Sequence, residues 1–215
     1  MLRRKSSSLI IITLVIVVIV VLQWIKVPGE SLVEKKPSNQ RITADNILLG
    51  ARAEAKKRVR YNAAYAVIAY PGGDISQTQG ACTDVVIRAL RNADIDLQVL
   101  IHQDMQANFA LYPQDYGLDA PDPNIDHRRV RNQMVFFSRF GQELPLTVAD
   151  QLETWQWGDI VSWRCADGQL HTGIVSDRTN RQGIPLVIHN NSVTKEEDCL
   201  QRWDIIGHYR YPAVF

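Results

Sequence analysis

The chain has 215 residues, with 24 Lys and Arg against 23 Asp and Glu. This length suits one domain of ordinary size and is too short for two. The two signs of charge are mixed along the chain, which excludes a basic stripe for nucleic acid and an acidic tail. Local segments must therefore carry the information about function.

The N-terminal segment has the length and composition of a membrane-spanning helix. Residues 6–25 carry no charge, and roughly 20 apolar residues are enough to cross a bilayer. Basic residues at 3–5 precede this run, which predicts a cytoplasmic N-terminus and an external remainder. No small-x-small cleavage site follows, so we expect an uncleaved signal anchor rather than a signal peptide.

This anchor predicts a single-pass protein of the inner (cytoplasmic) membrane, with its globular domain in the periplasm or outside the cell. A polar segment with Pro and Gly follows the apolar run and has the composition of a linker. The chain then divides into residues 1–25 as cytoplasmic N-terminus and anchor, 26–41 as linker, and 42–215 as the globular domain.

Local patterns in the globular part predict helices first and strands afterwards. Thr43 and Asp96 have side chains that cap helices, and apolar residues recur at helical spacing beyond them. After Pro145, short segments rich in β-formers alternate with turn residues. Helices followed by an antiparallel sheet make an α+β domain. We expect helices over 44–60, 82–91, 97–111 and 128–140, and strands over 159–165, 171–176, 186–190 and 205–211.

Cys82 is the first candidate for chemistry because it opens a predicted helix. A helix N-terminus presents free N–H groups and a partial positive charge, and both favour thiolate over thiol. We therefore expect the pKa of Cys82 to lie well below the ordinary thiol value. The same N–H groups can stabilise an oxyanion. A buried structural cysteine, or half of a disulfide, is the alternative.

A cysteine nucleophile needs a base, and the base needs a group that orients it. His171 begins one predicted strand and His189 ends the next, so hairpin pairing can bring the two side chains together. His102 and His208 are better explained as surface or core residues. Metal binding is the weaker interpretation, since the histidines lack a close spacing such as His-x-x-x-His. We expect no metal and no organic cofactor.

The segments that carry this chemistry follow one another in a set order. They read Ala81-Cys82-Thr-Asp, Trp157-Gly-Asp-Ile-Val, His171-Thr-Gly-Ile-Val and Val187-Ile-His. The set resembles the NlpC-type cell-wall cysteine peptidases of the papain-like clan. The resemblance implies a papain-like α+β domain whose nucleophile helix packs on a C-terminal antiparallel sheet. It also implies Cys82 as nucleophile, His171 as base and His189 as the orienting residue.

The globular domain also resembles a family of bacterial envelope proteins known as domain of unknown function 1287. The segments that carry this likeness include Tyr70-Pro-Gly-Gly-Asp, Asn124-Ile-Asp-His-Arg-Arg-Val, Gly158-Asp-Ile-Val-Ser-Trp and Gly207-His-Tyr-Arg-Tyr. This second resemblance implies a place in the cell envelope and brings no settled activity.

Two residues beside the catalytic set are candidates for substrate binding. Asp84 stands where the usual Asp-Cys-Ser-Gly motif of the NlpC-type peptidases has glycine, which changes the substrate subsite. Asn190 follows His189 and is the alternative orienting group for His171. Side chains alternate along a strand, so only one of the two can face His171.

Asp126, Arg128 and Arg129 stand where a Pro-rich loop enters a predicted helix. They are either a capped helix start with solvated arginines or a group that recognises carboxylates. Arginine presents a bidentate fork to a carboxylate, and peptidoglycan stem peptides carry carboxylates.

The main hypothesis is a cysteine hydrolase that cleaves an amide bond in a peptidoglycan peptide or another envelope amide. Two alternatives remain open: a thiol acyltransferase near the membrane, and a non-catalytic wall-binding module with a relic site. No nucleic-acid partner is expected, and the oligomeric state is not predicted.

Three cysteines in an exported protein suggest one disulfide and one free thiol. A disulfide at Cys82 would remove the nucleophile, so we expect the bridge to join Cys165 and Cys199. Three free thiols are the alternative.

Overall fold

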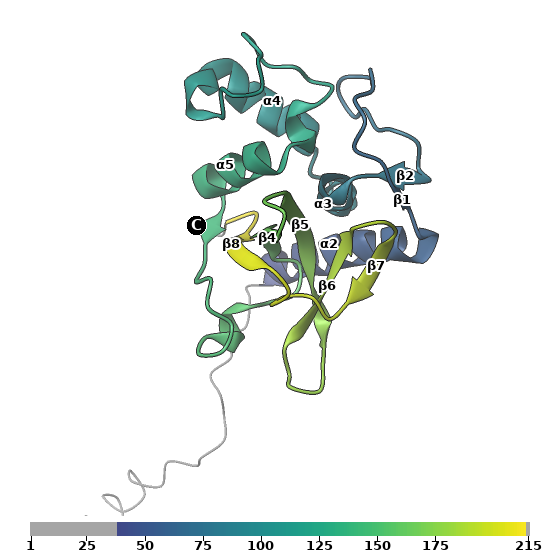
Figure 1. Cartoon of the computed structure of the whole chain (residues 1–215), viewed down its shortest axis with the longest axis vertical. Helices are drawn as coiled ribbons and strands as arrows, with labels where there is room; N and C mark the ends of the chain where they lie inside the picture. The colour runs from purple at the N-terminus through teal and green to yellow at the C-terminus, as the bar shows by residue number, and fades with distance from the viewer. Residues whose placement is uncertain (1–37, 214–215) are drawn as a thin grey trace, which may run out of the picture. The chain divides into compact units, whose positions relative to one another are not determined.

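A group of helices precedes a six-stranded antiparallel sheet in residues 38–213, the part of the chain that the computed structural model describes (Figure 1). This arrangement confirms the α+β class. Short 3₁₀ turns connect some of the elements, among them one at Asp126–Arg128. The helices are α2 (Ser38–Lys57), α3 (Cys82–Arg91), α4 (Leu97–Asn108) and α5 (Val130–Phe140).

The sheet has the strand order β3-β8-β4-β5-β6-β7, and every neighbouring pair is antiparallel. The strands β1 (Arg60–Tyr61) and β2 (Gln79–Gly80) pair in parallel as a separate ribbon. The second of them, β2, lies directly before α3. The six strands are β3 (Gln142–Glu143), β4 (Ile160–Arg164), β5 (Leu170–Thr179), β6 (Pro185–Asn190), β7 (Thr194–Glu197) and β8 (Asp204–Arg210).

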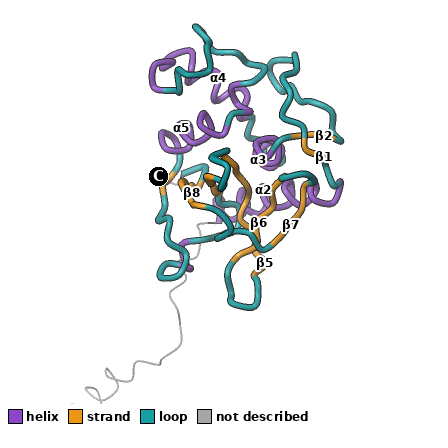
Figure 2. Tube along the Cα trace, viewed as in Figure 1, coloured by secondary structure: helices purple, strands orange, loops and turns teal. Residues whose placement is uncertain are grey.

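Alternating apolar side chains bury both faces of the central strands. Ile160, Ile174 and Ile188 face the core that α2 to α5 build. Val161 and its neighbours at 175 and 187 face a second core, closed by loop residues around 148–155 and 199–205. Figure 2 shows α3, α4 and α5 together on one side of the strands. Because successive residues point to opposite faces, each strand joins the two cores.

The helix boundaries differ in places from those expected. The first helix begins at Ser38, so the predicted linker over 26–41 ends inside α2. Thr43 therefore does not cap the helix; its hydroxyl donates to the Asn39 carbonyl at 3.0 Å within the helix. Asp96 does cap α4, because its side chain accepts from the Gln98 N–H at 3.0 Å.

The strand β7, at the edge of the sheet, was not predicted from the sequence. Its sequence is Thr-Lys-Glu-Glu, and a charged edge strand lacks the apolar alternation that identifies inner strands. The omission affects the site, because β7 pairs with β6, the strand that ends in His189 and Asn190.

Among residues 38–213, no helix is long and apolar enough to cross a membrane. The predicted anchor at residues 1–25 lies outside the described residues.

Candidate active site

Cys82 lies where the first turn of α3 meets the start of β5. The helix begins at Cys82, as predicted, with Ala81 as its N-cap residue. Cys82 is 4% exposed, and backbone groups of Thr172 on β5 and of Thr83 in the helix lie near enough to its thiol to lower the pKa. The register between β5 and β6 begins with Ile174 opposite Ile188, so Thr172 lies beyond that pairing. The sulfur therefore lies near the strand residue that directly follows His171.

A buried ion pair holds the first turn of α3. Asp84 accepts the Ala81 N–H at 2.6 Å, and its two oxygens accept from Arg128 at 2.9 and 3.0 Å. Arg128 also donates to the Ala64 carbonyl at 2.9 Å. Both charged side chains are buried. This pairing gives Asp84 and Arg128 a structural role: together they build the helix start, and neither presents a free charge.

Asp126 and Arg129 are also engaged within the fold. Asp126 is buried and accepts hydrogen bonds from the Asp122 N–H and from Arg129. The Arg129 guanidinium lies 3.9 Å from the centre of the Tyr116 ring, a cation–π contact. These contacts hold the segment within the fold, but no side chain caps α5 and Arg128 is buried rather than solvated, so the capped helix start with solvated arginines is not what the structure has.

Asn190 fixes the segment that leads into the helix. Its Nδ2 donates to the carbonyls of Gly80 at 2.8 Å and Val59 at 3.1 Å. The side chain thus holds the β1–β2 ribbon just before Cys82. The side-chain amide of Asn190 therefore donates to this backbone, and His189, rather than Asn190, contacts His171.

His171 and His189 form a hydrogen-bonded pair. Nε2 of His171 lies 2.7 Å from Nδ1 of His189, and the rings meet edge-to-face with their centroids 4.9 Å apart. Gly173 allows this approach: a Cβ there would lie 2.8 Å from Val187 Cγ1 and 3.0 Å from His189 Cβ. A side chain at 173 would push β6 away from β5.

Glu197 extends the pair and was not foreseen in the sequence. Its Oε1 lies 2.7 Å from His189 Nε2, and it also forms ion pairs with Arg202 at 2.7 Å and Lys195 at 2.8 Å. Burial alone would raise the pKa of Glu197, but hydrogen bonds from Arg202, Lys195 and His189 lower it to about 2. A hairpin turn after Asn190 was the signal that could have located β7 and, with it, this carboxylate.

The thiol and the imidazole are both neutral in the resting structure. Burial raises the pKa of Cys82 to about 12, although backbone N–H groups act against this rise. Burial, reinforced by His189 and Arg202, lowers the pKa of His171 to about 3. Desolvation disfavours the charged form of each group. The expectation of a low-pKa Cys82 is therefore wrong for this closed arrangement: the helix start cannot offset complete burial.

A pocket of about 350 Å³ opens beside His171. Tyr61 lies on its wall, and burial, with a smaller effect of a charge on Cys82, raises the pKa of Tyr61; Cys82 itself is not among the lining residues. Asp167 is the one Asp, Glu, Lys or Arg residue among the lining residues. The lining residues are Tyr61, Cys165, Ala166, Asp167, Gln169, Leu170, His171, Asn191 and Trp203.

All three cysteines are free thiols, which corrects the predicted Cys165–Cys199 disulfide. Cys165 lines the pocket beside His171, at the end of β4. Cys199 follows β7, and two strands, β5 and β6, separate β7 from β4. Cys165 thus lies at the pocket, whereas Cys199 is buried in the second core next to Leu200, whose carbonyl accepts from Trp163 on β4.

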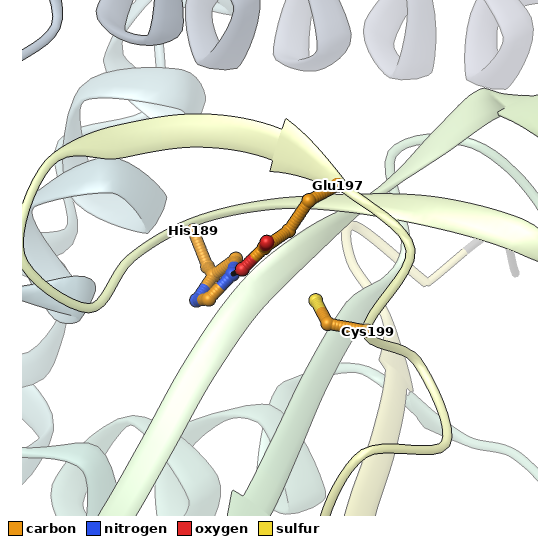
Figure 3. A group of neighbouring side chains, drawn as sticks. All are labelled: His189, Glu197 and Cys199. Atoms are coloured by element: carbon orange, nitrogen blue, oxygen red, sulfur yellow. Dashed lines mark hydrogen bonds and ion pairs between the residues drawn. The ribbon is translucent and has the colours of Figure 1, made fainter.

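Cys199 instead lies near the charged end of the histidine row. Figure 3 shows His189, Glu197 and Cys199 together, and one potential ligand atom from each lies within 4.8 Å of the others. Nitrogen, oxygen and sulfur donors of this kind can bind Zn²⁺. Arg202 and Lys195 also contact Glu197, and these two positive charges disfavour a cation at the same carboxylate.

Other histidines serve the fold. The His208 ring stacks on Trp155 with centroids 3.6 Å apart, and its Nε2 lies 3.2 Å from Asp159. His127 is buried in the 3₁₀ turn before α5, and burial lowers its pKa to about 4. The contacts of His208 identify it as structural, while Nδ1 of the buried His127 has no hydrogen-bond partner among the described residues.

Comparison with known proteins adds a family and one relative. The family model described as "Domain of unknown function (DUF1287)" matches residues 48–211. The chain is 50% identical over 163 residues to "Uncharacterized protein YijF" of Escherichia coli (strain K12), a match that covers 75% of this chain and 78% of that protein. No solved structure matches the chain.

Breaking the buried pair at the helix start should destabilise the protein strongly. Asp84→Asn leaves the Arg128 charge buried without its partner, and we expect the free energy of unfolding to fall by about 3–5 kcal/mol. Asp115→Asn is the matched control, because the Asp115–Arg131 ion pair is exposed and its loss should change little. Urea denaturation of both variants measures the difference, and equal effects would contradict the assignment.

The neutral thiol should make alkylation of Cys82 slow at pH 7. Iodoacetamide reacts with thiolate, so the rate at Cys82 should rise about tenfold per pH unit between pH 7 and 9, without a plateau. Peptide mapping by mass spectrometry separates Cys82 from Cys165 and Cys199. A plateau below pH 7 would instead reveal a thiolate–imidazolium pair and overturn the neutral resting state.

Proposed function

We propose that this chain, which belongs to the DUF1287 family, is a cysteine hydrolase that cleaves an amide bond in cell-wall peptides. The observation that carries the proposal is the hydrogen-bonded row His171–His189–Glu197 at the strand end where Cys82 rests. A nucleophile, a base and a group that orients the base are the parts that covalent catalysis requires. We also propose that the α+β fold is the papain-like, NlpC-type arrangement, with α3 as the nucleophile helix.

The proposed reaction begins with a neutral thiol. Nδ1 of His171, the ring nitrogen left free by the bond to His189, accepts the Cys82 proton as the sulfur attacks the amide carbonyl. Backbone N–H groups around the sulfur stabilise the oxyanion that forms. The imidazolium then protonates the leaving amine, which leaves a thioester on Cys82. His171 next activates water, which releases the acid product and restores the thiol.

Burial strengthens the stabilisation of charge during the proposed reaction, but it also makes the thiol harder to deprotonate. In a site with little water, fixed N–H dipoles and Glu197 act on developing charge more strongly than they would in solution. The cost is that attack must begin from a thiol whose pKa is about 12. Proton transfer to His171 therefore has to accompany attack rather than precede it.

The pocket beside His171 is the proposed substrate site. Its volume is at the lower end of the range for ligand sites, and its wall is mainly polar and aromatic. The arginines first considered for carboxylate recognition are not among its lining residues. We propose that a short peptide segment enters here, with Tyr61 and Trp203 packing against it.

The buried thiol favours one alternative, a non-catalytic module that binds the wall and keeps a relic site. The two functions differ in one experiment. Full-length protein in detergent is incubated with purified peptidoglycan, and mass spectrometry identifies the released peptides.

Cys82→Ala should abolish the release of peptides, while Cys165→Ser should retain it. Cys165 is the comparison because it is the thiol that lines the pocket beside His171 and makes no part of the histidine row. Release by the Cys82→Ala variant would contradict the hydrolase, and loss in Cys165→Ser alone would move the nucleophile to Cys165. Transfer of the acyl group to an amine rather than to water would identify an acyltransferase.

We further propose that residues 1–25 anchor the protein in the inner membrane with the domain outside the cytoplasm, because basic residues at 3–5 precede the apolar run. A C-terminal reporter that needs disulfides for activity should then be active. An inactive fusion, together with an active cytoplasmic reporter at the same position, would contradict this topology.

A further inference from the structure

Glu197 stands at the end of the histidine row, on the strand that the sequence pattern did not reveal. On the ladder between β6 and β7, Glu197 lies opposite Val187, and His189 lies opposite Lys195. Glu197 and His189 are thus diagonal neighbours on one face of the sheet, where long side chains meet. The 2.7 Å contact between Oε1 and Nε2 follows from this register.

The surroundings keep Glu197 ionised. Arg202 and Lys195 each lie within ion-pair distance of it, and the pKa of the carboxyl falls to about 2. An ionised carboxylate can only accept hydrogen bonds. The proton in the contact with His189 therefore sits on Nε2 of His189.

This assignment determines the protons of both rings. Burial lowers the pKa of His189 and of His171, so both imidazoles are neutral at pH 7. A neutral imidazole with its proton on Nε2 has an acceptor at Nδ1. Nδ1 of His189 lies 2.7 Å from Nε2 of His171, so the proton in that contact belongs to His171 Nε2. Nδ1 of His171 is then left without a proton.

We propose that Glu197 is a positioning residue that fixes the tautomers of His189 and His171, leaving Nδ1 of His171 as the proton acceptor. The inference rests on the proposed function for the use of that acceptor, and on the hydrogen-bonded row and the charges around Glu197 for the tautomers. The opposite tautomer would place a proton on Nδ1 of His171 and leave it unable to take one from Cys82. Glu197 therefore acts on the base through His189 and touches neither thiol nor substrate.

A metal site at His189, Glu197 and Cys199 is the competing use of the same atoms (Figure 3). A cation on His189 Nε2 would displace the proton there and move it to Nδ1 of His189, which reverses both tautomers. The two cationic side chains on Glu197 argue for the hydrogen-bonded row. The two uses predict opposite tautomers and can therefore be distinguished directly.

The test reads the tautomers by NMR, without any need for activity. Full-length protein with ¹⁵N-labelled histidine is prepared in detergent micelles, and long-range ¹H–¹⁵N correlations separate protonated from bare ring nitrogens. His171→Gln and His189→Gln variants assign the signals. We expect both rings to carry their proton on Nε2 in the wild-type protein.

Variants at position 197 then test the cause. In Glu197→Leu the two ring protons should no longer be held on Nε2. In Glu197→Gln they should stay there, because the amide oxygen still accepts from Nε2 of His189. Glu196→Gln is the matched control: Glu196 neighbours Glu197 on β7 and pairs instead with Arg52 and Arg178. In the peptidoglycan assay, Glu197→Leu should lower the turnover rate by about 10²- to 10⁴-fold, the contribution of a working general base, with a smaller effect for Glu197→Gln.

Three results would overturn the inference. One is a wild-type spectrum with the proton on Nδ1 of either ring, which needs no variant to fold. Another is a Glu197→Leu variant in which both rings still carry their proton on Nε2. The third is stoichiometric binding of Zn²⁺ that Cys199→Ser abolishes, which would make the cluster a metal site. Absence of hydrolysis by the wild-type protein would defeat the proposed function and leave the tautomer result standing.

Discussion

The buried first turn of α3, which sets Cys82 near the Thr172 backbone of β5, is the constraint around which the site is arranged. This approach arises where β5 and β6 cease to pair, so that a strand backbone becomes available to the first turn of α3. Asp84 and Arg128 hold that turn from the helix side, and Asn190 holds the ribbon that leads into it. Displacing any of these would move the sulfur relative to the strand that carries His171.

Burial sets the electrostatics of the whole site. It makes the neutral forms of Cys82 and His171 the stable ones, and it requires the one anion of the row, Glu197, to have cationic partners. The charge needed for catalysis is therefore absent at rest and has to develop as a substrate reacts. Such a thiol would be protected from adventitious oxidation and alkylation, because the thiolate is the reactive species in both. Because the thiol is neutral at rest, a working site and a relic site would differ only in how they respond to a bound substrate.

Local patterns in the sequence identified what local physics determines. The start of α3 at Cys82, the cap at Asp96 and the strands of His171 and His189 all follow from spacing within a few residues. Those patterns could not predict which residues far apart in the sequence contact one another. Asp84 and Arg128 are 44 positions apart, and nothing around either residue indicates that each neutralises the other. Their charges were therefore assigned to a substrate.

The missed strand had a related cause. The sequence of β7 is polar, since an edge strand packs little of its surface, and nothing in the pattern distinguishes Glu197 from other charged residues. Only the register with β6 reveals that this carboxylate reaches His189. The predicted disulfide does not form either: Cys165 lines the pocket at the end of β4, and Cys199 is buried in the second core after β7.

The most direct test of the central claim is to look for the thioester on Cys82. Full-length protein is mixed with peptidoglycan peptides, quenched in acid within the first turnovers, digested and examined by mass spectrometry. The account predicts a Cys82 peptide heavier by the acyl part of the substrate, sensitive to hydroxylamine and absent when substrate is omitted. Products that form with no adduct on Cys82, or with an adduct on Cys165 instead, would contradict it.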